Sequence, residues 1–326
     1  MKKAIPLKAV LCAVTLAVSG VAGAQTAAYP NKPVRIIVPF PPGGGIDVLV
    51  RALGSELSKK WGQPFVVENK PGAATFIGAE FVARSPADGY TLLTTTDPTF
   101  TSNRHLFKSL PYDPDGFEPV IQMVKGDNLI FAHPTMPFAD LKELVAAARK
   151  GNEKLSFGSY GNGTQPQLVF GYLNKREGID LLHVPYKGIA PVMMAVASKE
   201  VDLSVASAGV AGEMIKGGRV RPLAVAGAKR LPQFPDVKTT SEQGFPYLKS
   251  FIWYGLLAPK GAPSEIVDKL NADIGAILRN EAFAEQQVTS RGMTVMAGSP
   301  KEFAEAMKQD TALVGEMVKA ANVKPE

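Results

Sequence analysis

Short apolar runs alternate along the chain with longer segments in which an aliphatic residue recurs about every four positions. The runs 34–38, 65–68 and 91–95 have the composition of strands buried in a parallel sheet. Between them, 46–61 and 76–84 carry apolar residues at helical spacing, and a glycine or proline turn follows each segment. This βαβαβ order with short connections predicts an α/β fold with a doubly wound, mostly parallel sheet.

The alternation returns in the second half of the chain. A helix over 140–150 opens the second series, and further helices follow the strands expected over 155–158, 181–184 and 201–205, with 221–226 as the last strand. Between the two series, the polar stretch 125–128 separates two expected strands, 118–124 and 129–132, and we interpret it as a crossing between lobes. The apolar run 251–258 is interpreted as the return to the first lobe.

The predicted organisation is two doubly wound α/β lobes joined by two crossovers. Lobe 1 comprises 25–126 and 249–326, and lobe 2 comprises 127–248, with hinges expected near 125–128 and 245–250. The helices predicted from Pro263, over 281–290 and over 300–321 are expected to cover lobe 1 without taking part in its chemistry.

The first 24 residues have the pattern of a secretory signal peptide. Three lysines precede an apolar stretch over 9–18, and the small residues Ala22-Gly23-Ala24 form a cleavage site, which predicts a periplasmic protein. Cleavage near Ala24 removes Cys12, the only cysteine, so the mature chain has no disulfide. A chain of about 300 residues is long enough to be stable through its own cores.

Charge and histidine content argue against several classes of function. The net charge of +6 falls to +3 once Lys2, Lys3 and Lys8 are removed, which gives no basis for nucleic-acid binding. The three histidines, His105, His133 and His183, have no metal-site spacing. We therefore expect no metal and no cofactor.

Two glycine turns carry the candidate chemistry. Gly43-Gly44-Gly45 follows the first strand and opens a helix, whose free N–H groups and dipole suit an anion. Val48 stands where a dinucleotide fingerprint has its third glycine, and Ile46-Asp47 stands where a P-loop has Lys-Ser/Thr. A plain turn with Asp47 stabilising the helix start is the other interpretation.

The second turn, Ser159-Tyr160-Gly161-Asn162-Gly163, leads to a helix near Thr164. Its hydroxyl, amide and backbone groups could form a second anion seat, and the alternative is an ordinary Asn-Gly turn with Thr164 as N-cap. Two such units in an exported two-lobed chain favour a ligand gripped between the lobes.

A series of motifs resembles the Bug-type family, the periplasmic substrate-binding receptors of tripartite tricarboxylate transporters. One of these motifs is Val38-Pro39-Phe40-Pro41-Pro42-Gly43-Gly44-Gly45. The motifs occur in order along nearly the whole mature chain, and the matching segments are 29–35, 38–45, 68–72, 88–92, 112–114, 158–164, 183–188 and 255–259. The resemblance implies a flytrap-like receptor for a small carboxylate, possibly aromatic, that delivers it to a two-component membrane permease. We expect a monomer that is not an enzyme.

The resemblance also implies which residues hold a ligand carboxylate, partly through ordered water. These are Gly43, Gly44, Gly45 and Asp47 from one lobe, and Ser159, Gly161, Asn162, Gly163 and Thr164 from the other. Further lining residues are expected to be Phe40, Ile46, Thr96, Asp97, Tyr160, Gln165, Tyr186, Ser207 and Ala208.

Two departures from the family pattern bear on the ligand. Ile46 replaces a threonine, and Ala206-Ser207-Ala208-Gly209 replaces an Asp-Asn turn that would suit an ammonium group. A ligand with an uncharged, fairly apolar body is therefore expected, with Phe100 or Tyr160 on its distal side.

A secreted hydrolase is the alternative function. Ser159 is not in a G-x-S-x-G elbow, and the spacing of Asp97, His183 and Ser207 gives no support for a triad. We expect Asp97 to cap its turn or to set the polarity of the cleft.

Overall fold

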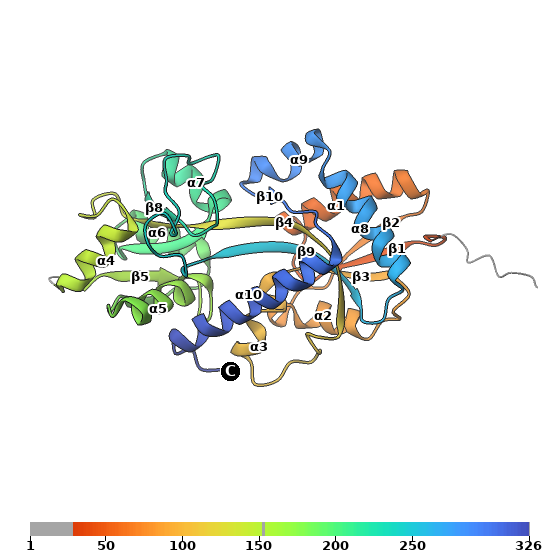
Figure 1. Ribbon diagram of the computed structural model, residues 1–326, viewed down its shortest axis with the longest axis horizontal. Helices are drawn as coiled ribbons and strands as arrows, with labels where there is room; N and C mark the ends of the chain where they lie inside the picture. Colours follow the sequence, from red (N-terminus) through yellow and green to blue (C-terminus); the bar gives the residue numbers. More distant parts are fainter. Residues whose placement is uncertain (1–28, 152–153, 326) are drawn as a thin grey trace, which may run out of the picture.

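The computed structural model describes residues 29–151 and 154–325, and the predicted signal peptide lies outside this range. The described chain forms two α/β halves at the ends of an elongated molecule (Figure 1). Strands of both halves follow the order β2-β1-β3-β9-β4-β7-β5-β6. No helix of the described chain is both long and apolar enough to cross a membrane.

The first half is built on strands from both ends of the chain. Parallel strands β2, β1 and β3 lie beside antiparallel β9 and β4, and β10 pairs with β4. The strands are β1 (Val34–Val38), β2 (Phe65–Asn69), β3 (Thr91–Thr96), β4 (Phe117–Ala132), β9 (Phe251–Pro259) and β10 (Thr294–Val295). The helices are α1 (Gly45–Trp61), α2 (Phe76–Ala83), α3 (Asn103–Leu106), α8 (Ser264–Leu278), α9 (Glu281–Gln287) and α10 (Pro300–Ala320), with 3₁₀ turns η1 (Ala73–Thr75), η2 (Asp97–Thr99) and η3 (Thr289–Arg291).

Helices cover both faces of this sheet because its strands are apolar on both sides. Ile36 packs in a core with α1 and α8, whereas its neighbour Ile37 packs in a core with α2 and the start of α10. Helix α1 ends at Gly62, whose φ of 66° gives the left-handed C-cap expected from the sequence. The predicted doubly wound α/β fold is confirmed here.

The second half repeats this arrangement on the far part of β4. Helices α4 and α5 cover one face of its sheet, and α6 and α7 cover the other. Its strands are β5 (Ser156–Ser159), β6 (Leu182–Pro185), β7 (Leu203–Ser207) and β8 (Arg221–Val225). Its helices are α4 (Leu141–Lys150), α5 (Gln165–Glu177), α6 (Ile189–Ala197) and α7 (Ala208–Lys216).

The break predicted at 125–128 is wrong, because β4 is one continuous 16-residue strand. Lys125 and Asp127 are partly exposed while Gly126 and Asn128 are buried, so one face of the strand is open where it passes between the halves. This open face made a strand resemble a polar loop. β9 runs beside β4, and Asn128 N donates to Ser250 O at 3.0 Å. The halves are therefore joined by a two-stranded ribbon.

Helix α10 forms another connection between the halves. Phe303 near its start packs on Trp253 in the first half, whereas Val314, Met317 and Val318 belong to the core of the second half. Figure 1 shows α10 running diagonally beneath β9 from one half to the other. A helix predicted only as a cover for the first lobe thus contacts both halves.

Candidate functional site

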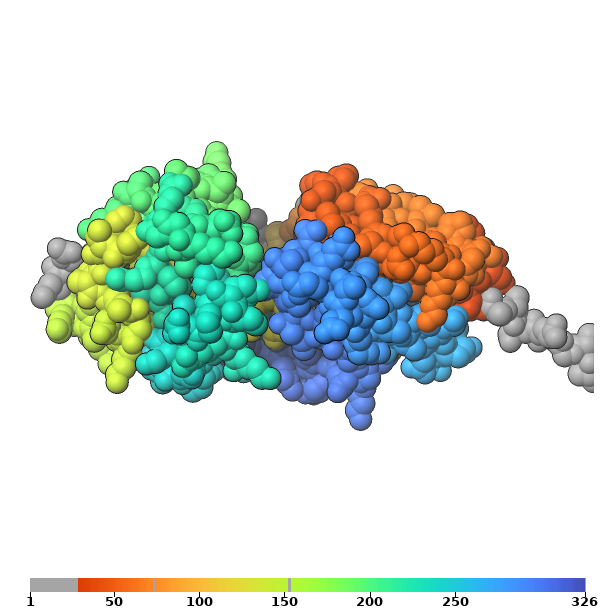
Figure 2. Space-filling view, turned by 90° about the horizontal axis from the view of Figure 1, so that it is seen from above, coloured from red at the N-terminus to blue at the C-terminus, as the bar shows by residue number. Residues whose placement is uncertain are grey.

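A cavity of about 1000 Å³ lies where the two halves meet. The surface is hollowed at this junction, between the green second half and the blue C-terminal segment (Figure 2). The start of α1, the η2–α3 segment and residues 287–293 line it from the first half. The second glycine turn and the β7–α7 turn line it from the second half, and β4 and β9 lie between them.

In the first glycine turn, only Gly45 of the predicted residues lines the cavity; Phe40, Gly43, Gly44, Ile46 and Asp47 do not. A Cβ on Gly45 would lie 3.0 Å from the hydroxyl of Tyr254, which shows how closely this hydroxyl approaches the start of α1. Ile46 is 4% exposed and packs in the core with α1 and α8. The turn therefore presents backbone rather than side chains to the cavity.

The carboxylate of Asp47 holds this turn together instead of facing the cavity. Its oxygens accept hydrogen bonds from Gly43 N at 2.9 Å, Arg51 Nε at 3.0 Å and Asn69 Nδ2 at 2.9 Å. Burial alone would raise the pKa of Asp47, but these donors lower it below its ordinary value. The plain-turn interpretation of Asp47 describes these contacts best.

The second glycine turn presents five predicted residues to the cavity: Tyr160, Asn162, Gly163, Thr164 and Gln165. Several of its donors are already used within the turn. Thr164 Oγ1 donates to Gly161 O at 2.6 Å, and Gly163 N donates to Gln167 Oε1 at 2.6 Å. Gln165 reaches the first half, with its Nε2 3.4 Å from Phe251 O. This wall is richer in side chains than the first, but fewer of its N–H groups are free.

Ser159 and Gly161 do not line the cavity. Ser159 is fully buried, and its hydroxyl donates to Gly161 O at 3.1 Å and lies 2.6 Å from His183 Nε2. The two contacts are compatible when Nε2 carries the ring proton and donates to Ser159, because the single hydroxyl proton then goes to Gly161 O. Burial lowers the pKa of His183, which keeps its ring neutral.

The triad of the hydrolase alternative is not assembled. Asp97 and Ser207 line the cavity, but His183 does not, and among the described hydrogen bonds none joins any two of the three. His183 instead stacks on Phe157 with 5.1 Å between ring centroids. The predicted absence of triad geometry agrees with this placement.

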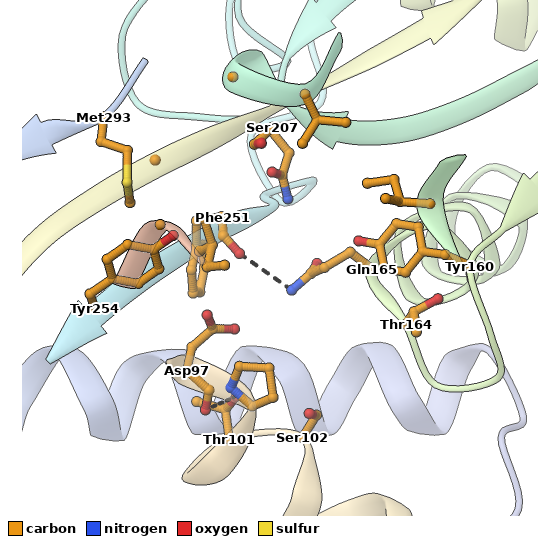
Figure 3. Close-up of a pocket in the computed structure, with 18 of the residues that line it drawn as sticks. Asp97, Thr101, Ser102, Tyr160, Thr164, Gln165, Ser207, Phe251, Tyr254 and Met293 are labelled. Carbon is orange, nitrogen blue, oxygen red and sulfur yellow. Dashed lines mark hydrogen bonds between the residues drawn. The ribbon is translucent and has the colours of Figure 1, made fainter. Parts of the chain in front are cut away.

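Asp97 lies at the floor of the cavity and is 1% exposed. Oδ1 accepts a hydrogen bond from Trp253 N at 3.3 Å, and burial raises the pKa of this carboxyl to about 8. Figure 3 shows the carboxyl pointing into the cavity, with Tyr254 on one side and Gln165 and Tyr160 on the other. An uncharged ligand body was expected because the β7–α7 turn lacks an acid, yet the η2 turn brings one to the same cavity.

The remaining predicted residues divide between cavity, core and surface. Ser207 lines the cavity, whereas Thr96 and Ala208 are buried beside it without lining it. Tyr186 does not line the cavity, and its Oη donates to Glu200 Oε1 at 2.8 Å. The expectation for Phe100 is wrong, because its ring is fully buried and packs edge-on against Phe117. Its place next to a polar turn gave no sign that it faces inward.

Sequence reasoning missed the C-terminal segment that closes one side of the cavity. Gln287, Ser290, Arg291, Gly292 and Met293 all line it. Arg291 O would lie 2.8 Å from a Cβ on Gly209, so this segment touches the β7–α7 turn of the second half directly. The charge of Arg291 also acts on Tyr254, opposing the rise that burial causes in the tyrosine pKa. No local pattern in the sequence marks this long-range contact.

Comparison with known proteins finds relatives along most of the chain. Residues 49–323 match the family described as tripartite tricarboxylate transporter family receptor. An adipate-bound structure of R. palustris Rpa4515 is similar, with 31% identity, a TM-score of 0.75 and coverage of 91% of this chain and 100% of that one. MatC (Rpa3494) from Rhodopseudomonas palustris with bound malate is similar at 30% identity and a TM-score of 0.70, with coverage of 89% of this chain and 100% of that one. The structure of the periplasmic binding protein BugD is similar at 34% identity and a TM-score of 0.70, with coverage of 91% of this chain and 100% of that one.

Proposed function

Because the chain belongs to the tripartite tricarboxylate transporter family of receptors, we propose that it is a periplasmic receptor that binds a small carboxylate between its two halves. The related proteins are solute-binding receptors, and the chain is a receptor rather than an enzyme. Carboxylate binding is supported by the adipate and malate held in two structures that share about a third of its sequence.

The observation that carries the proposal is a pair of helix starts on opposite walls of one cavity. Gly45 begins the 17-residue α1 on one wall, and Thr164 is the N-cap of the 13-residue α5 on the other. Free N–H groups and the positive end of each helix dipole favour an anion. A carboxylate between them would be attracted by both halves.

We place the ligand carboxylate mainly against the start of α1. There, Gly45 faces the cavity, the hydroxyl of Tyr254 lies beside it, and Arg291 adds a positive charge on the same side. At α5, in contrast, Gln167 already occupies Gly163 N. A micromolar ligand needs roughly −8 kcal/mol, which a few charge-assisted hydrogen bonds and apolar burial can supply.

The proposed binding cycle is hinge closure. The lobes would be 25–126 with 249–326 and 127–248, and bending of the β4–β9 ribbon would bring Gly45 and Thr164 together on the ligand. We propose that the leader is cleaved near Ala24, that the receptor is a monomer, and that its closed form is recognised by a two-component permease.

Calorimetry on Gly45→Ala and Gly44→Ala tests the proposal. A panel of citrate, malate, adipate, benzoate and 6-aminohexanoate is screened first by thermal shift, and at least one member is expected to stabilise the wild type. The added Cβ in Gly45→Ala displaces Tyr254 and narrows the seat, so affinity for that ligand should fall about tenfold or more.

Gly44→Ala is the matched control, because its Cβ has only Pro41 O nearby, at 3.8 Å, and Gly44 does not line the cavity. Its affinity should equal that of the wild type, and NMR should show the ligand chemically unaltered after incubation. Failure of every carboxylate to bind, or equal binding by both variants, would refute the proposal.

A further inference from the structure

Asp97 is a buried acid that the local structure leaves almost without donors. It is 1% exposed, and its one side-chain hydrogen bond within the described structure is a long one, 3.3 Å from Trp253 N to Oδ1. No described lysine or arginine forms an ion pair with it. A buried carboxyl without a cation is costly as an ion, so a partner from the cavity would change its energetics strongly.

The groups that face Asp97 come from every element around it. The positive charge of Lys125 on β4 favours the ionised form of Asp97, but its ammonium lies over the ring of Phe251, 4.1 Å from the ring centroid. Asp310 on α10 is a second acid, held by Trp253 Nε1 at 3.1 Å, and it repels a negative charge on Asp97. A negative charge on Asp97 also contributes to raising the pKa values of the Tyr160 and Tyr254 hydroxyls. Of these three charged residues only Asp97 lines the cavity; a second acid and a lysine lie near it, and the lysine is already in contact with an aromatic ring.

Aromatic side chains surround the same point. Tyr160 after β5 and Phe251 and Tyr254 on β9 all line the cavity with Asp97 (Figure 3). A carboxyl among aromatic rings is the combination that proteins use for an organic cation, since the acid pairs with the charge and the rings add cation–π attraction.

We propose that Asp97 binds a positively charged amine of the ligand, so that the receptor selects a zwitterion carrying both a carboxylate and an ammonium group. This inference rests on the proposed function, which supplies the carboxylate seat at Gly45, Tyr254 and Arg291. The ammonium then lies at the floor of the cavity, between Asp97 and the rings of Tyr160 and Phe251. A diacid would place its second carboxylate there instead, against the carboxyl of Asp97.

Ligand binding is consequently linked to a proton. With a pKa of about 8, Asp97 in the empty receptor holds a proton at neutral pH. An ammonium group favours the ionised acid, so binding releases the proton, and affinity for the zwitterion rises roughly tenfold between pH 6.5 and pH 8. An aliphatic amine stays charged over this range, since its pKa is about 10. Binding of a diacid takes up a proton and weakens over the same range.

Matched ligand pairs test the inference in the full mature chain. Calorimetry compares 6-aminohexanoate with adipate, and leucine with 4-methylpentanoate, at pH 6.5 and pH 8. At pH 8 the amine of at least one pair should bind the wild type at least tenfold more tightly than its partner, with proton release measured in buffers of different ionisation enthalpy. Asp97→Asn should weaken that amine at least tenfold and leave the partner acid equal or tighter.

Asp127→Asn is the charge-matched control, because it removes an acid beside the cavity that does not line it, and the preference should persist. The inference is overturned if the wild type prefers the amine-free acid in both pairs, if amine binding takes up a proton, or if Asp97→Asn keeps the preference. In each of these results a carboxylate still binds, so the proposed function stands. Absence of binding by every acid and amine would refute the proposed function itself.

Discussion

The segments that follow β1 and β3 each bury one aspartate, Asp47 and Asp97, yet the surroundings of the two carboxyls differ in the number of hydrogen-bond donors. Asp47 is 2% exposed and accepts hydrogen bonds from three groups, whereas Asp97 is 1% exposed and accepts one long bond from a backbone N–H. The pKa of Asp47 is lowered, and that of Asp97 is raised to about 8. Burial alone therefore does not decide the direction of a carboxyl pKa shift; the number of hydrogen-bond donors around the carboxyl does.

The contrast extends to what each turn offers the cavity. After β1, the Asp47 side chain accepts a hydrogen bond within the glycine turn, and the turn faces the cavity only with its backbone at Gly45. After β3 the backbone is wound into η2, where Thr101 N donates to Asp97 O at 2.9 Å, and the carboxyl faces the ligand space. One strand end thus presents the start of a helix to the cavity, and another presents a carboxyl group; we propose that the first binds an anion and the second a cation.

Removing the carboxylate of Asp47 is the change expected to have the largest effect. Asp47→Ala leaves Gly43 N without its acceptor, removes one of the two acceptors of Asn69 Nδ2, and should lower the free energy of unfolding by about 3 kcal/mol. Urea unfolding measures the loss. Asp180→Ala is the control, since its carboxylate is 81% exposed in a surface pair with Lys154 and should cost less than about 0.5 kcal/mol. A similar loss in both variants would contradict the structural role of Asp47.

Asp97 and Asp47 should change the free energy of unfolding in opposite directions as the pH rises. Between its ordinary pKa and about 8, Asp97 keeps a proton in the folded state that the unfolded chain has lost, so rising pH destabilises the ligand-free fold. The contribution of Asp97 should amount to roughly 2 kcal/mol between pH 6 and pH 8. Asp47, with its lowered pKa, contributes stability that is lost only as the pH falls through acidic values.

Urea titrations at pH 6, 7 and 8 measure this slope in the wild type and in Asp97→Asn. The variant should lose less stability with rising pH than the wild type, with a residual slope from Asp127 and Asp310, whose pKa values burial also raises. Parallel curves for the two proteins would show that Asp97 is already ionised in the folded state.

Local patterns predicted the architecture because its elements depend on local chemistry. The spacing of Leu49, Leu53 and Leu57 identified the buried face of α1, and Gly62 identified its end. Two strand–glycine turn–helix units were expected to face one another, and the structure places Gly45 and Thr164 on one cavity. Periodicity and turn chemistry are encoded within a few residues, so sequence reasoning reads them directly.

The misses share a different cause, which is contact between distant segments. Whether the carboxyl of Asp47 or of Asp97 faces the cavity depends on Arg51, Asn69 and Trp253, and no spacing rule reveals where those donors lie. The approach of Arg291 to Gly209 likewise depends on the angle between the halves. Such arrangements are set by tertiary packing, which overrides local preference.

Asn69→Ala sharpens the comparison at its smallest scale. Asn69 Nδ2 donates to Asp47 Oδ1 at 2.9 Å and to Phe40 O at 3.0 Å, while its Oδ1 accepts from Arg51 Nη2 at 2.7 Å. The variant removes one of three donors from Asp47 and should lower the free energy of unfolding by about 1 kcal/mol, less than the loss in Asp47→Ala because Gly43 and Arg51 still hold the carboxylate.

Asn31→Ala is the control, because the bond between Asn31 Oδ1 and Tyr90 Oη is exposed and should contribute less than about 0.5 kcal/mol. Urea unfolding compares the variants, and acid titration of Asn69→Ala should show stability being lost at a higher pH than in the wild type, since the pKa of Asp47 rises when a donor is removed. If Asn69→Ala and the wild type lose stability at the same acidic pH, Arg51 and Gly43 alone set the ionisation of Asp47. The contrast with Asp97 would then depend on one cation and one backbone N–H rather than on all three donors.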